Sequence, residues 1–391
     1  MREAVILAAG EGRRLRPFTV TKPKVMLSIA SKPILQYVVE SLAQNGVRNI
    51  ILIVGYRKEQ VFDYIGSGEQ FGVDITYITQ DRQLGTAHAL AQAKGVTENE
   101  FLVLPGDKLI EPDTITQFVG IKPEALLVKR VDNPARFGIV LMEKGMVKTI
   151  AEKPQQPESN IINTGIYAFT KEVFSSIKLE LDIPDALKNW LVQGKSITAV
   201  ETDGTWLDVA YPWDVLSLND AILRRIPANL NGMIETGVSL KGLVSVGKDT
   251  VIRSNSYIVG PVVIGEGCEI GPNVCIFPAT SIADNVVISP FTEVKNSVIS
   301  DDVNIGSGSI IQDSVIDRGC VIGGQFTACS GEAEVTVNSE HHLVKVGAML
   351  GEGCSLGNSV TAQPGVIVGN YSQIKALKLI SGRFPDRSLV V

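Results

Sequence analysis

The segment from Leu7 to Lys24, LAAGEGRRLRPFTVTKPK, joins an apolar run to glycines and then to cations. Gly10 and Gly12 let backbone N–H groups approach a ligand without obstruction by a Cβ atom. Arg14 and Lys24 stand among the cations that follow. A triphosphate needs local positive charge of this kind, so the segment predicts a site for a polyphosphate.

Two familiar phosphate-binding motifs are excluded in this chain. The dinucleotide-binding fingerprint GxGxxG requires a third glycine where this chain has Leu15. The P-loop pattern GxxxxGK[ST] occurs nowhere in the sequence. A phosphate site in this segment would therefore be of another kind, and the alternative is a charged surface loop.

Two aspartates follow short apolar runs further along the chain. Asp107 ends the strand-like run FLVLPGD, and Asp208 follows the aromatic run GTWL. Open α/β sheets bind their ligands beyond the carboxyl ends of the strands, which is where such residues lie. Each aspartate alone is also compatible with a surface turn, so the assignment of the pair to a site depends on the other motifs of the chain.

The first part of the chain alternates apolar strands with helical segments. We expect strands at 4–9, 49–55, 74–78 and 101–107, and helices at 34–44, 58–65, 87–95 and 213–225. Such alternation predicts an α/β domain over residues 1–226, with a mainly parallel sheet covered on both faces. The Pro, Asn and Gly residues that follow predict a linker over 227–242.

From about residue 243 an aliphatic residue recurs at every sixth position, with two slips of one residue. A period of six is typical of a β-solenoid whose coils have three short sides. The break at 324–345 is too long for a corner and should project as an insert. The aliphatic positions are Val246, Ile252, Ile258, Ile264, Ile270, Ile276, Ile282, Ile288, Val294, Ile299, Ile305, Ile311, Ile316, Ile322, Leu350, Leu356, Ala362, Val368 and Ile374.

These repeats resemble the left-handed parallel β-helix of the hexapeptide-repeat proteins, and the resemblance implies that fold over residues 243–391. The glycine- and cation-rich segment resembles the signature LAAGxGTRLxPLTxxxPK of sugar-1-phosphate nucleotidylyltransferases. Arg13 stands where that family usually has Thr, and Ser28 replaces a usual Pro. The resemblance implies a Rossmann-like nucleotidyltransferase domain with a mixed sheet. It also implies an enzyme that joins a nucleoside triphosphate to a sugar 1-phosphate and releases pyrophosphate.

The same resemblance implies the site residues. Arg14 and Lys24 match the family's catalytic cations, and Asp107 and Asp208 match the two carboxylates that hold Mg²⁺. The matching nucleotide-binding positions are Leu7, Ala9, Gly10, Gly12, Gln80, Gly85 and Thr86, of which Gln80 and Gly85 contact the pyrimidine base. The matching positions for the sugar phosphate are Gly138, Glu152, Lys153, Asn163 and Gly165.

The identity of the substrates stays open at the level of sequence. The segment QDRQLGTAHAL (80–90) has an LGTxHA form that looks more like N-acetylglucosamine uridylyltransferases than like glucose thymidylyltransferases. The candidates are UTP or dTTP with N-acetylglucosamine 1-phosphate or glucose 1-phosphate. His88 in this segment is expected to have a structural role.

Relatives with both domains resemble bifunctional enzymes that also acetylate glucosamine 1-phosphate in the β-helix. Ser307 stands where that type has a histidine base, Ile310 where it has a tyrosine, and Ser330 where it has an asparagine. His341 and His342, the histidines of this domain, both fall in the insert. We therefore expect a β-helix without acetyltransferase activity. A further alternative is a non-catalytic regulatory subunit, although such chains usually lose a catalytic cation or a metal carboxylate.

Charge and hydropathy exclude two classes of partner. The formal net charge is −6 and the isoelectric point is about 5.3, without a long run of like charge, which argues against nucleic-acid binding. No stretch of 18 apolar residues could span a membrane, so we expect a cytoplasmic enzyme. Solenoids of this type associate through flat faces, and a homo-oligomer such as a trimer is expected through the β-helix.

Overall fold

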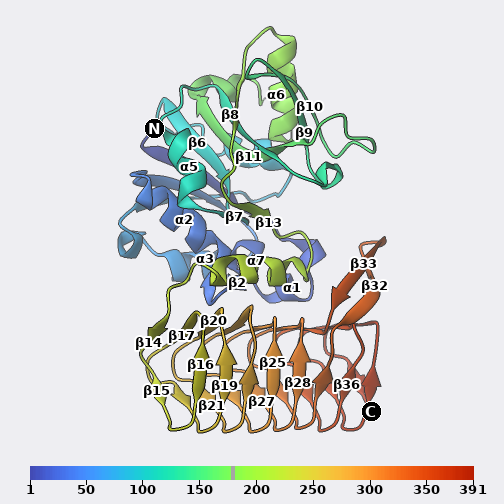
Figure 1. The fold of residues 1–391 in the computed structure, drawn as a ribbon. Helices are drawn as coiled ribbons and strands as arrows, with labels where there is room; N and C mark the ends of the chain where they lie inside the picture. Colours follow the sequence, from blue (N-terminus) through green and yellow to red (C-terminus); the bar gives the residue numbers. More distant parts are fainter. Residues whose placement is uncertain (178–180) are drawn as a thin grey trace. The chain divides into compact units, whose positions relative to one another are not determined.

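The computed structural model describes residues 1–177 and 181–391, which divide into two compact units (Figure 1). The first unit consists of Met1–Glu11, Pro23–Met26 and Ile34–Asp208. The second consists of Gly12–Lys22, Leu27–Pro33 and Val209–Val391. The chain therefore leaves the first unit within the glycine- and cation-rich segment, which the sequence places wholly in one domain.

A nine-stranded mixed sheet forms the centre of the first unit, in the order β5-β4-β1-β6-β11-β8-β12-β10-β9. The strands β5, β4, β1 and β6 run parallel, whereas β11 is antiparallel to both β6 and β8. The mixed sheet implied by the family resemblance is confirmed, and it is mainly parallel as expected, because β8 and β12 also pair in parallel on the other side of β11. The strands are β1 (Glu3–Ala8), β4 (Asn49–Val54), β5 (Asp74–Thr79), β6 (Glu100–Pro105), β8 (Ala125–Arg130), β9 (Ile139–Glu143), β10 (Met146–Ala151), β11 (Ile161–Thr170) and β12 (Thr198–Glu201).

Helices cover this sheet on both faces because its central strands are apolar on both sides. In β1, Ala4 and Ile6 pack into one core and Val5 into the other, as the alternation of a strand requires. The first core includes residues of α2 (Ile34–Gln44), α3 (Lys58–Ile65) and α5 (Pro112–Val119). The second core includes residues of α4 (Thr86–Ala91) and α6 (Ile183–Val192). The expected helix at 87–95 is shorter than predicted.

The C-terminal part of the second unit is a parallel β-solenoid of three sheets, which Figure 1 shows as a stack of coils. Every aliphatic position of the six-residue repeat lies in its core at 3% exposure or less, so the repeat is confirmed. The first sheet contains β14 (Asn229–Leu230), β17 (Val244–Val246), β20 (Val262–Ile264), β23 (Thr280–Ile282), β26 (Val298–Ile299), β29 (Val315–Ile316), β34 (Met349–Leu350), β37 (Ile367–Val368) and β40 (Arg383–Phe384).

The other two sheets complete each coil. The second contains β15 (Met233–Ile234), β18 (Val251–Ile252), β21 (Glu269–Ile270), β24 (Val287–Ile288), β27 (Asn304–Ile305), β30 (Val321–Ile322), β35 (Ser355–Leu356), β38 (Gln373–Ile374) and β41 (Leu389–Val390). The third contains β16 (Ser239–Lys241), β19 (Tyr257–Val259), β22 (Cys275–Ile276), β25 (Glu293–Lys295), β28 (Ile310–Gln312), β31 (Thr327–Ala328), β36 (Thr361–Ala362) and β39 (Leu379–Ile380).

Two expectations about this region require correction. The predicted linker 227–242 forms the first coil, because β14, β15 and β16 pair in register with β17, β18 and β19. Its side chains are more exposed than those of later coils, so its sequence lacks the strong aliphatic pattern. The predicted insert is an antiparallel hairpin of β32 (Gly331–Val337) and β33 (Glu340–Val346), which projects from the stack in Figure 1 and begins later than position 324.

Short elements join the solenoid within the second unit. They are α1 (Phe18–Thr21), β2 (Ser28–Ile29), β3 (Lys32–Pro33) and α7 (Asp214–Leu223). Asn219 of α7 is fully buried, donates a hydrogen bond to the carbonyl of Ala279 and accepts one from the amide of Ala30. This side chain thus connects three segments that are far apart in the sequence.

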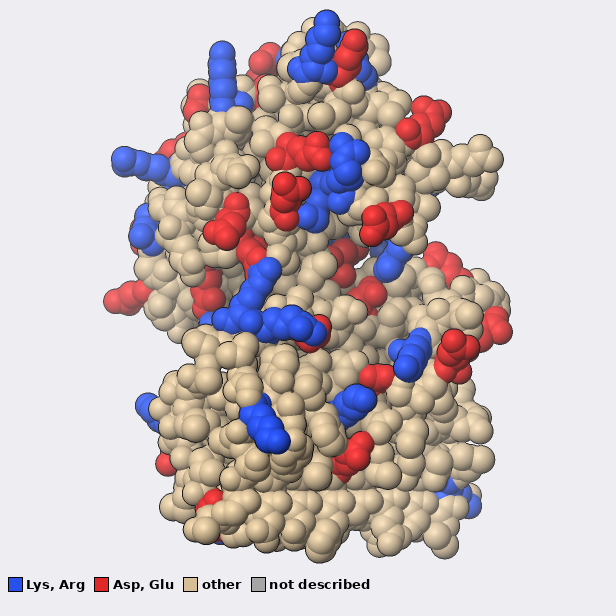
Figure 2. All heavy atoms as spheres, viewed as in Figure 1, with Lys and Arg blue, Asp and Glu red and all other residues tan. Residues whose placement is uncertain are grey.

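Surface charges are mixed rather than segregated. Figure 2 shows acidic and basic side chains interspersed on one face of the molecule, with much uncharged surface on the solenoid. Charges of both signs therefore occur on both units on this face. Among the residues that the structure describes, no helix is long and apolar enough to cross a membrane.

Candidate active site

Four charged side chains meet at one edge of the first unit. The Nζ atom of Lys24 lies 2.5 Å from Oδ2 of Asp107 and 3.7 Å from Oδ1 of Asp208. Lys108 forms an ion pair with Oδ1 of Asp208. The two predicted carboxylates and one predicted catalytic cation are thus brought together, and a second lysine joins them.

The local backbone explains why these groups converge. Asp107 follows β6, where the amide of Gly106 donates to the carbonyl of Leu7 at the end of β1 (2.9 Å). A Cβ atom at Gly106 would approach Ile6 Cγ2 to 3.0 Å, so glycine suits this close passage. Asp208 ends β13 (Trp206–Asp208), which pairs antiparallel with β7 (Lys108–Ile110) and sets Asp208 directly opposite Lys108.

Lys108 was not among the predicted site residues. Its Nζ also lies 5.3 Å from the ring centroid of Trp206, so the lysine is held from two sides. The one feature of the sequence that points to Lys108 as a site residue is its position directly after Asp107. The register that pairs it with Asp208, however, cannot be read from either segment alone.

The electrostatics of the cluster favour an ionised Asp107. Burial raises the pKa of the Asp107 carboxyl, but the ammonium groups of Lys24 and Lys108 outweigh burial and hold this pKa below its ordinary value. The neighbouring charge of Asp208 acts in the opposite direction and is the weaker influence. Asp107 is therefore a carboxylate at neutral pH.

The donor set fits a divalent cation that takes most of its ligands from elsewhere. Mg²⁺ is typically held by one or two carboxylates together with phosphate oxygens and water. Asp107 and Asp208 both lie within 4 Å of the Lys24 ammonium group, so a single cation already pairs with both carboxylates. Within residues 1–177 and 181–391, no group of three or more His, Cys, Asp or Glu side chains forms a complete metal cage.

The predicted base-binding segment lies between β5 and α4. Gln80 is buried, and its Nε2 lies 3.2 Å from the carbonyl oxygen of Gly85 and 2.8 Å from Nδ1 of His88. The amide nitrogen of Gln80 is thus engaged in holding the loop, and His88 has a structural contact. Thr86 donates through its backbone amide to Oδ1 of Asp182 (2.9 Å), which anchors the start of α4.

Gly85 itself cannot be replaced without a shift of the backbone. Its φ angle is +147°, and an added Cβ would lie 2.3 Å from the carbonyl oxygen of Leu181. The other predicted nucleotide-binding residues of this unit, Leu7, Ala9 and Gly10, lie at the carboxyl end of β1. The carbonyl of Ala9 accepts a hydrogen bond from the amide of Tyr56 (3.2 Å), which ties this end of β1 to the segment after β4.

The predicted sugar-binding residues form a second group in the first unit. The amide of Asn163 donates to the carbonyl of Gly138 (2.8 Å), and an added Cβ at Gly138 would lie 2.7 Å from Oε2 of Glu152. Gly165 has φ of +81° and donates its amide to Oδ1 of Asn163 (2.8 Å). Lys153 lies 3.9 Å from Glu152, and both side chains are half exposed. The structure therefore brings all five residues together.

Gly12 and Arg14 belong to the second unit. Gly12 has φ of +73° and precedes a 3₁₀ helix, η1 (Arg13–Leu15). The Arg14 guanidinium carbon lies 5.7 Å from the ring centroid of Tyr211, and the Tyr211 hydroxyl donates to Oε2 of Glu340 (2.5 Å). The predicted catalytic arginine is therefore held by an aromatic ring rather than by an acidic partner alone.

The family follows from comparison with known proteins. Residues 3–225 match the family model "Nucleotidyl transferase". The chain belongs to the nucleotidyl transferase family. Residues 258–346 also match the model "GMPPB C-terminal domain", which falls within the solenoid. The predictions of a nucleotidylyl-transferring enzyme and of its α/β fold are confirmed.

Similar proteins include members with one domain and with two. "Bifunctional protein GlmU" of Methanococcus maripaludis is 36% identical over 99% of this chain and 97% of its own length. "Bifunctional sugar-1-phosphate nucleotidylyltransferase/acetyltransferase" of Sulfurisphaera tokodaii is 34% identical over 95% of each chain. A solved structure of a putative glucose-1-phosphate thymidylyltransferase from Bacillus anthracis is 32% identical, with a TM-score of 0.54, over 58% of this chain and 97% of its own.

Nucleotidyl transferases generally use a divalent metal ion, in agreement with the donor set of Asp107 and Asp208.

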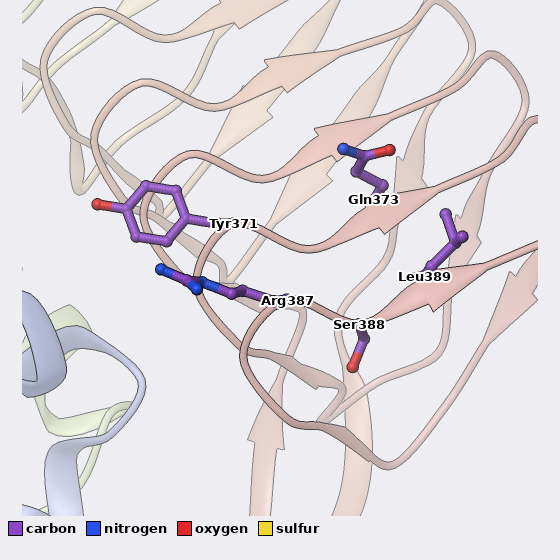
Figure 3. Close-up of a pocket in the computed structure, with 5 residues that line it drawn as sticks. All are labelled: Tyr371, Gln373, Arg387, Ser388 and Leu389. Carbon is purple, nitrogen blue, oxygen red and sulfur yellow. The ribbon is translucent and has the colours of Figure 1, made fainter.

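A separate hollow lies at the last coils of the solenoid, with a volume of about 470 Å³ (Figure 3). Its lining residues are Tyr371, Gln373, Arg387, Ser388 and Leu389. None of them is a predicted site residue, and the hollow contains no acidic pair for a metal ion.

The charged cluster predicts a measurable shift in the Asp107 pKa. In a Lys24→Met variant, a positive charge that stabilises the carboxylate is lost, so the pKa of Asp107 should rise. NMR titration of selectively labelled aspartate carboxyl groups would measure it. Lys148→Met, which removes an exposed lysine paired with Glu143, serves as the control and should leave Asp107 unchanged. An unaltered pKa in Lys24→Met would contradict the electrostatic account.

Proposed function

We propose that this enzyme transfers a nucleotidyl group from a nucleoside triphosphate to a sugar 1-phosphate, with Mg²⁺, and releases pyrophosphate. The observation that carries the proposal is the position of Lys24 between the carboxylates of Asp107 and Asp208. This arrangement places a cation for phosphate next to two ligands for a divalent ion. A surface salt bridge with no catalytic role would not need two partly buried acids around one lysine.

The chemistry of the proposed reaction explains which groups the site contains. The nucleophile is a phosphate oxygen of the sugar 1-phosphate, which is already ionised at neutral pH, so no general base is required. Catalysis then consists of aligning two anions and neutralising charge as the bond to pyrophosphate breaks. Lys24 and Arg14 would bear on the phosphates. Lys108 would keep Asp208 in position through their ion pair.

Asp107 and Asp208 are the residues that would hold Mg²⁺. When bound there, the ion supplies positive charge to the phosphate oxygens and lowers the repulsion between the two substrates. Lys153 and Glu152 would bind the sugar phosphate and the sugar hydroxyls, and Asn163 would bind a further hydroxyl or an N-acetyl group. Gln80 and Gly85 would define the wall against which the base lies.

The proposed substrates are a pyrimidine nucleotide and a hexose 1-phosphate. We favour UTP with N-acetylglucosamine 1-phosphate, and dTTP with glucose 1-phosphate is the second candidate. The LGTxHA form of the base-binding segment supports the first pair. The name of a relative from Streptomyces antibioticus, "Glucose-1-phosphate thymidylyltransferase", 34% identical over 72% of this chain, supports the second. Such a reaction draws on cytoplasmic nucleoside triphosphates, so we also propose a cytoplasmic location.

A substrate matrix tests the proposed function. Purified protein with Mg²⁺ would receive UTP, dTTP, ATP, CTP or GTP, each combined with glucosamine, N-acetylglucosamine, glucose or galactose 1-phosphate, and pyrophosphate release would be followed. One strongly preferred pair is expected, and chelation of the metal should abolish the signal. Silence across the matrix would instead support the regulatory-subunit alternative.

The catalytic assignment predicts large losses in rate. Lys24→Ala and Asp107→Ala should each lower kcat by at least about 100-fold, because each removes charge stabilisation that is needed in the transition state. Steady-state pyrophosphate release would measure both. Lys148→Ala, at an exposed ion pair on β10, is the matched control and should retain the original rate. Near-normal rates in the first two variants would refute the assignment.

The sugar pocket predicts a different kinetic effect. In Gly138→Ala, the added Cβ would meet Oε2 of Glu152 at 2.7 Å, so the glutamate must move. Because this interaction serves ground-state binding, KM for the sugar 1-phosphate should rise about tenfold with little change in kcat. Gly120→Ala has open space around its added Cβ and is the control. Unchanged KM in Gly138→Ala would remove Glu152 from the sugar site.

A second activity, acetyl transfer in the solenoid, has one structural observation in its favour. His341 Nδ1 lies 2.9 Å from Oε1 of Glu334 on the hairpin, and a carboxylate can orient an imidazole as a base. Both side chains are about two-thirds exposed, however, and neither lines the hollow at the last coils. We propose that the solenoid lacks this activity. Rapid release of CoA from acetyl-CoA and glucosamine 1-phosphate, lost in His341→Ala, would overturn that view.

We also propose that the solenoid mediates a homo-oligomer, such as a trimer. Its surface includes exposed apolar side chains such as Phe291, which is 70% exposed, and a broad uncharged area is visible in Figure 2. Light scattering coupled to size-exclusion chromatography would give the mass directly. A monomer at micromolar concentration would rule out this assembly.

A further inference from the structure

The Gly12–Lys22 segment, which carries Arg14, belongs to the same compact unit as the solenoid. Its contacts with that unit include three whose partners are widely separated in the sequence, besides a hydrogen bond from Arg383 to the carbonyl of Arg16 (3.5 Å). The three involve Pro17, Lys22 and Arg14 itself, and each has a partner on the solenoid, its hairpin or the segment before α7. The segment is thus held near its start, its middle and its end.

Asn370 provides the middle contact. This side chain is 1% exposed, and its Nδ2 donates to the carbonyl of Pro17 (3.0 Å) in a fully buried hydrogen bond. Its Oδ1 accepts from the backbone amide of Glu352 on the preceding coil (2.8 Å), and Nδ2 also donates to Asp386 (3.1 Å). Asn370 therefore has two tasks, one in the solenoid corner and one at Pro17.

In other coils, the corner residue has only the first task, which is to accept a backbone amide of the preceding coil. At the same type of corner, Asp284, Asp301 and Asp386 each accept the backbone amide of the preceding coil through Oδ1. A carboxylate is sufficient for that purpose, because only an acceptor is required. The contact with the Pro17 carbonyl needs a donor, which the amide of Asn370 supplies and an ionised aspartate could not.

Lys22 forms the contact at the end of the segment. Its Nζ lies 2.6 Å from Oδ1 of Asp317, whose side chain is 4% exposed and which also accepts the amide of Arg318 (2.9 Å). The loss of one partner from a buried pair leaves an uncompensated charge, so such a contact strongly restricts the backbone around it. Because α1 lies directly before Lys22, this ion pair fixes its orientation on the solenoid.

The contact at Arg14 runs through Tyr211 to the hairpin. Glu340 accepts the Tyr211 hydroxyl, and the His342 ring centroid lies 4.3 Å from that of Tyr211. The hydrogen bond from Tyr211 lowers the pKa of Glu340, which is therefore ionised at neutral pH. Trp213 stacks on Tyr211 at 5.1 Å. The ring over which Arg14 lies is held on several sides.

We propose that the solenoid holds the Gly12–Lys22 segment, and with it Arg14, in the conformation that nucleotidyl transfer requires. Asn370, Asp317 and Glu340 are its positioning residues, which act through Pro17, Lys22 and Tyr211. This inference rests on the proposed function, because it takes Arg14 as a group that bears on the phosphates. A displacement of about 1 Å at such a group can cost on the order of 100-fold in rate.

Asn370→Asp tests the proposal with a minimal change. Aspartate retains the acceptor that three other corners use, but when ionised it removes the donors to Pro17 and to Asp386. The variant is therefore made in an Asp386→Asn background, which keeps two carboxylates from facing each other, and its rate is compared with that of Asp386→Asn alone. We expect kcat for pyrophosphate release to fall by about tenfold or more, with KM for the sugar 1-phosphate unchanged within about twofold. Asp301→Asn, the converse exchange at a corner without a recorded contact to the segment, is the matched control and should retain kcat. Equal kcat in the double variant and in Asp386→Asn alone would overturn the proposal.

A pair of variants at Lys22 separates positioning from stability. Lys22→Met leaves the buried Asp317 without its cation and should lower both the thermal midpoint and kcat. Lys22→Met combined with Asp317→Asn removes the buried charge, so the midpoint should recover while kcat stays low. Hydrogen exchange of the 12–22 backbone amides should remain faster than in the original protein. Recovery of kcat together with stability would mean that the contact is merely structural.

Failure of this proposal is distinguishable from failure of the proposed function. If the original protein shows no activity in the substrate matrix, the proposed function is refuted, and the positioning role falls with it. If the original protein is active and Lys24→Ala is not, while Asn370→Asp in the Asp386→Asn background matches Asp386→Asn alone, only the positioning role is refuted. Activity lost in Asn370→Asp with an unchanged thermal midpoint supports both.

Discussion

The path of the chain between its two compact units is the constraint on which the rest of the structure depends. Within the signature segment, the chain passes from the first unit to the second after Glu11 and returns at Pro23. Arg14 and Lys24, which match the same family motif, are therefore fixed by different cores. Any account of the proposed reaction must explain how each core secures its own cation.

The first unit secures its part of the site through strand register. Lys24 lies in a 3₁₀ helix, η2 (Lys24–Met26), whose Val25 is buried in the core below the sheet. Asp107 is delivered by β6 and Asp208 by β13, and backbone pairing sets the spacing of each. The side chains of the cluster thus sit on rigid elements, as a site that must hold its geometry against strong charge requires.

Much of this architecture is predictable because it depends on local sequence patterns. Every aliphatic position of the six-residue repeat lies in the solenoid core, and the glycine-rich motif, Asp107 and Asp208 can each be found from short segments. The first coil at 229–241 was mistaken for a linker because its side chains are partly exposed and carry a weak repeat. Lys108 was missed because its role follows from pairing with a strand about a hundred residues away.

The contacts of the second unit lie beyond sequence patterns for the same reason. Asn370 and Pro17 are separated by 353 positions, and Lys22 and Asp317 by 295. An asparagine at a solenoid corner is as ordinary in sequence as an aspartate, because both residues can accept a backbone amide there. Only the fold shows that this particular asparagine also donates to the Pro17 carbonyl.

The signature segment is divided between the two units, and each unit makes its own contacts with its part of the segment. The acidic pair, the base-binding loop and the sugar pocket all belong to the first unit, so changes in the solenoid leave their internal contacts intact. Arg14 alone among the proposed catalytic groups depends on the solenoid and its hairpin. Within the second unit, the contacts at Pro17, Lys22 and Arg14 are the means by which the solenoid, its hairpin and the segment before α7 hold the Gly12–Lys22 segment.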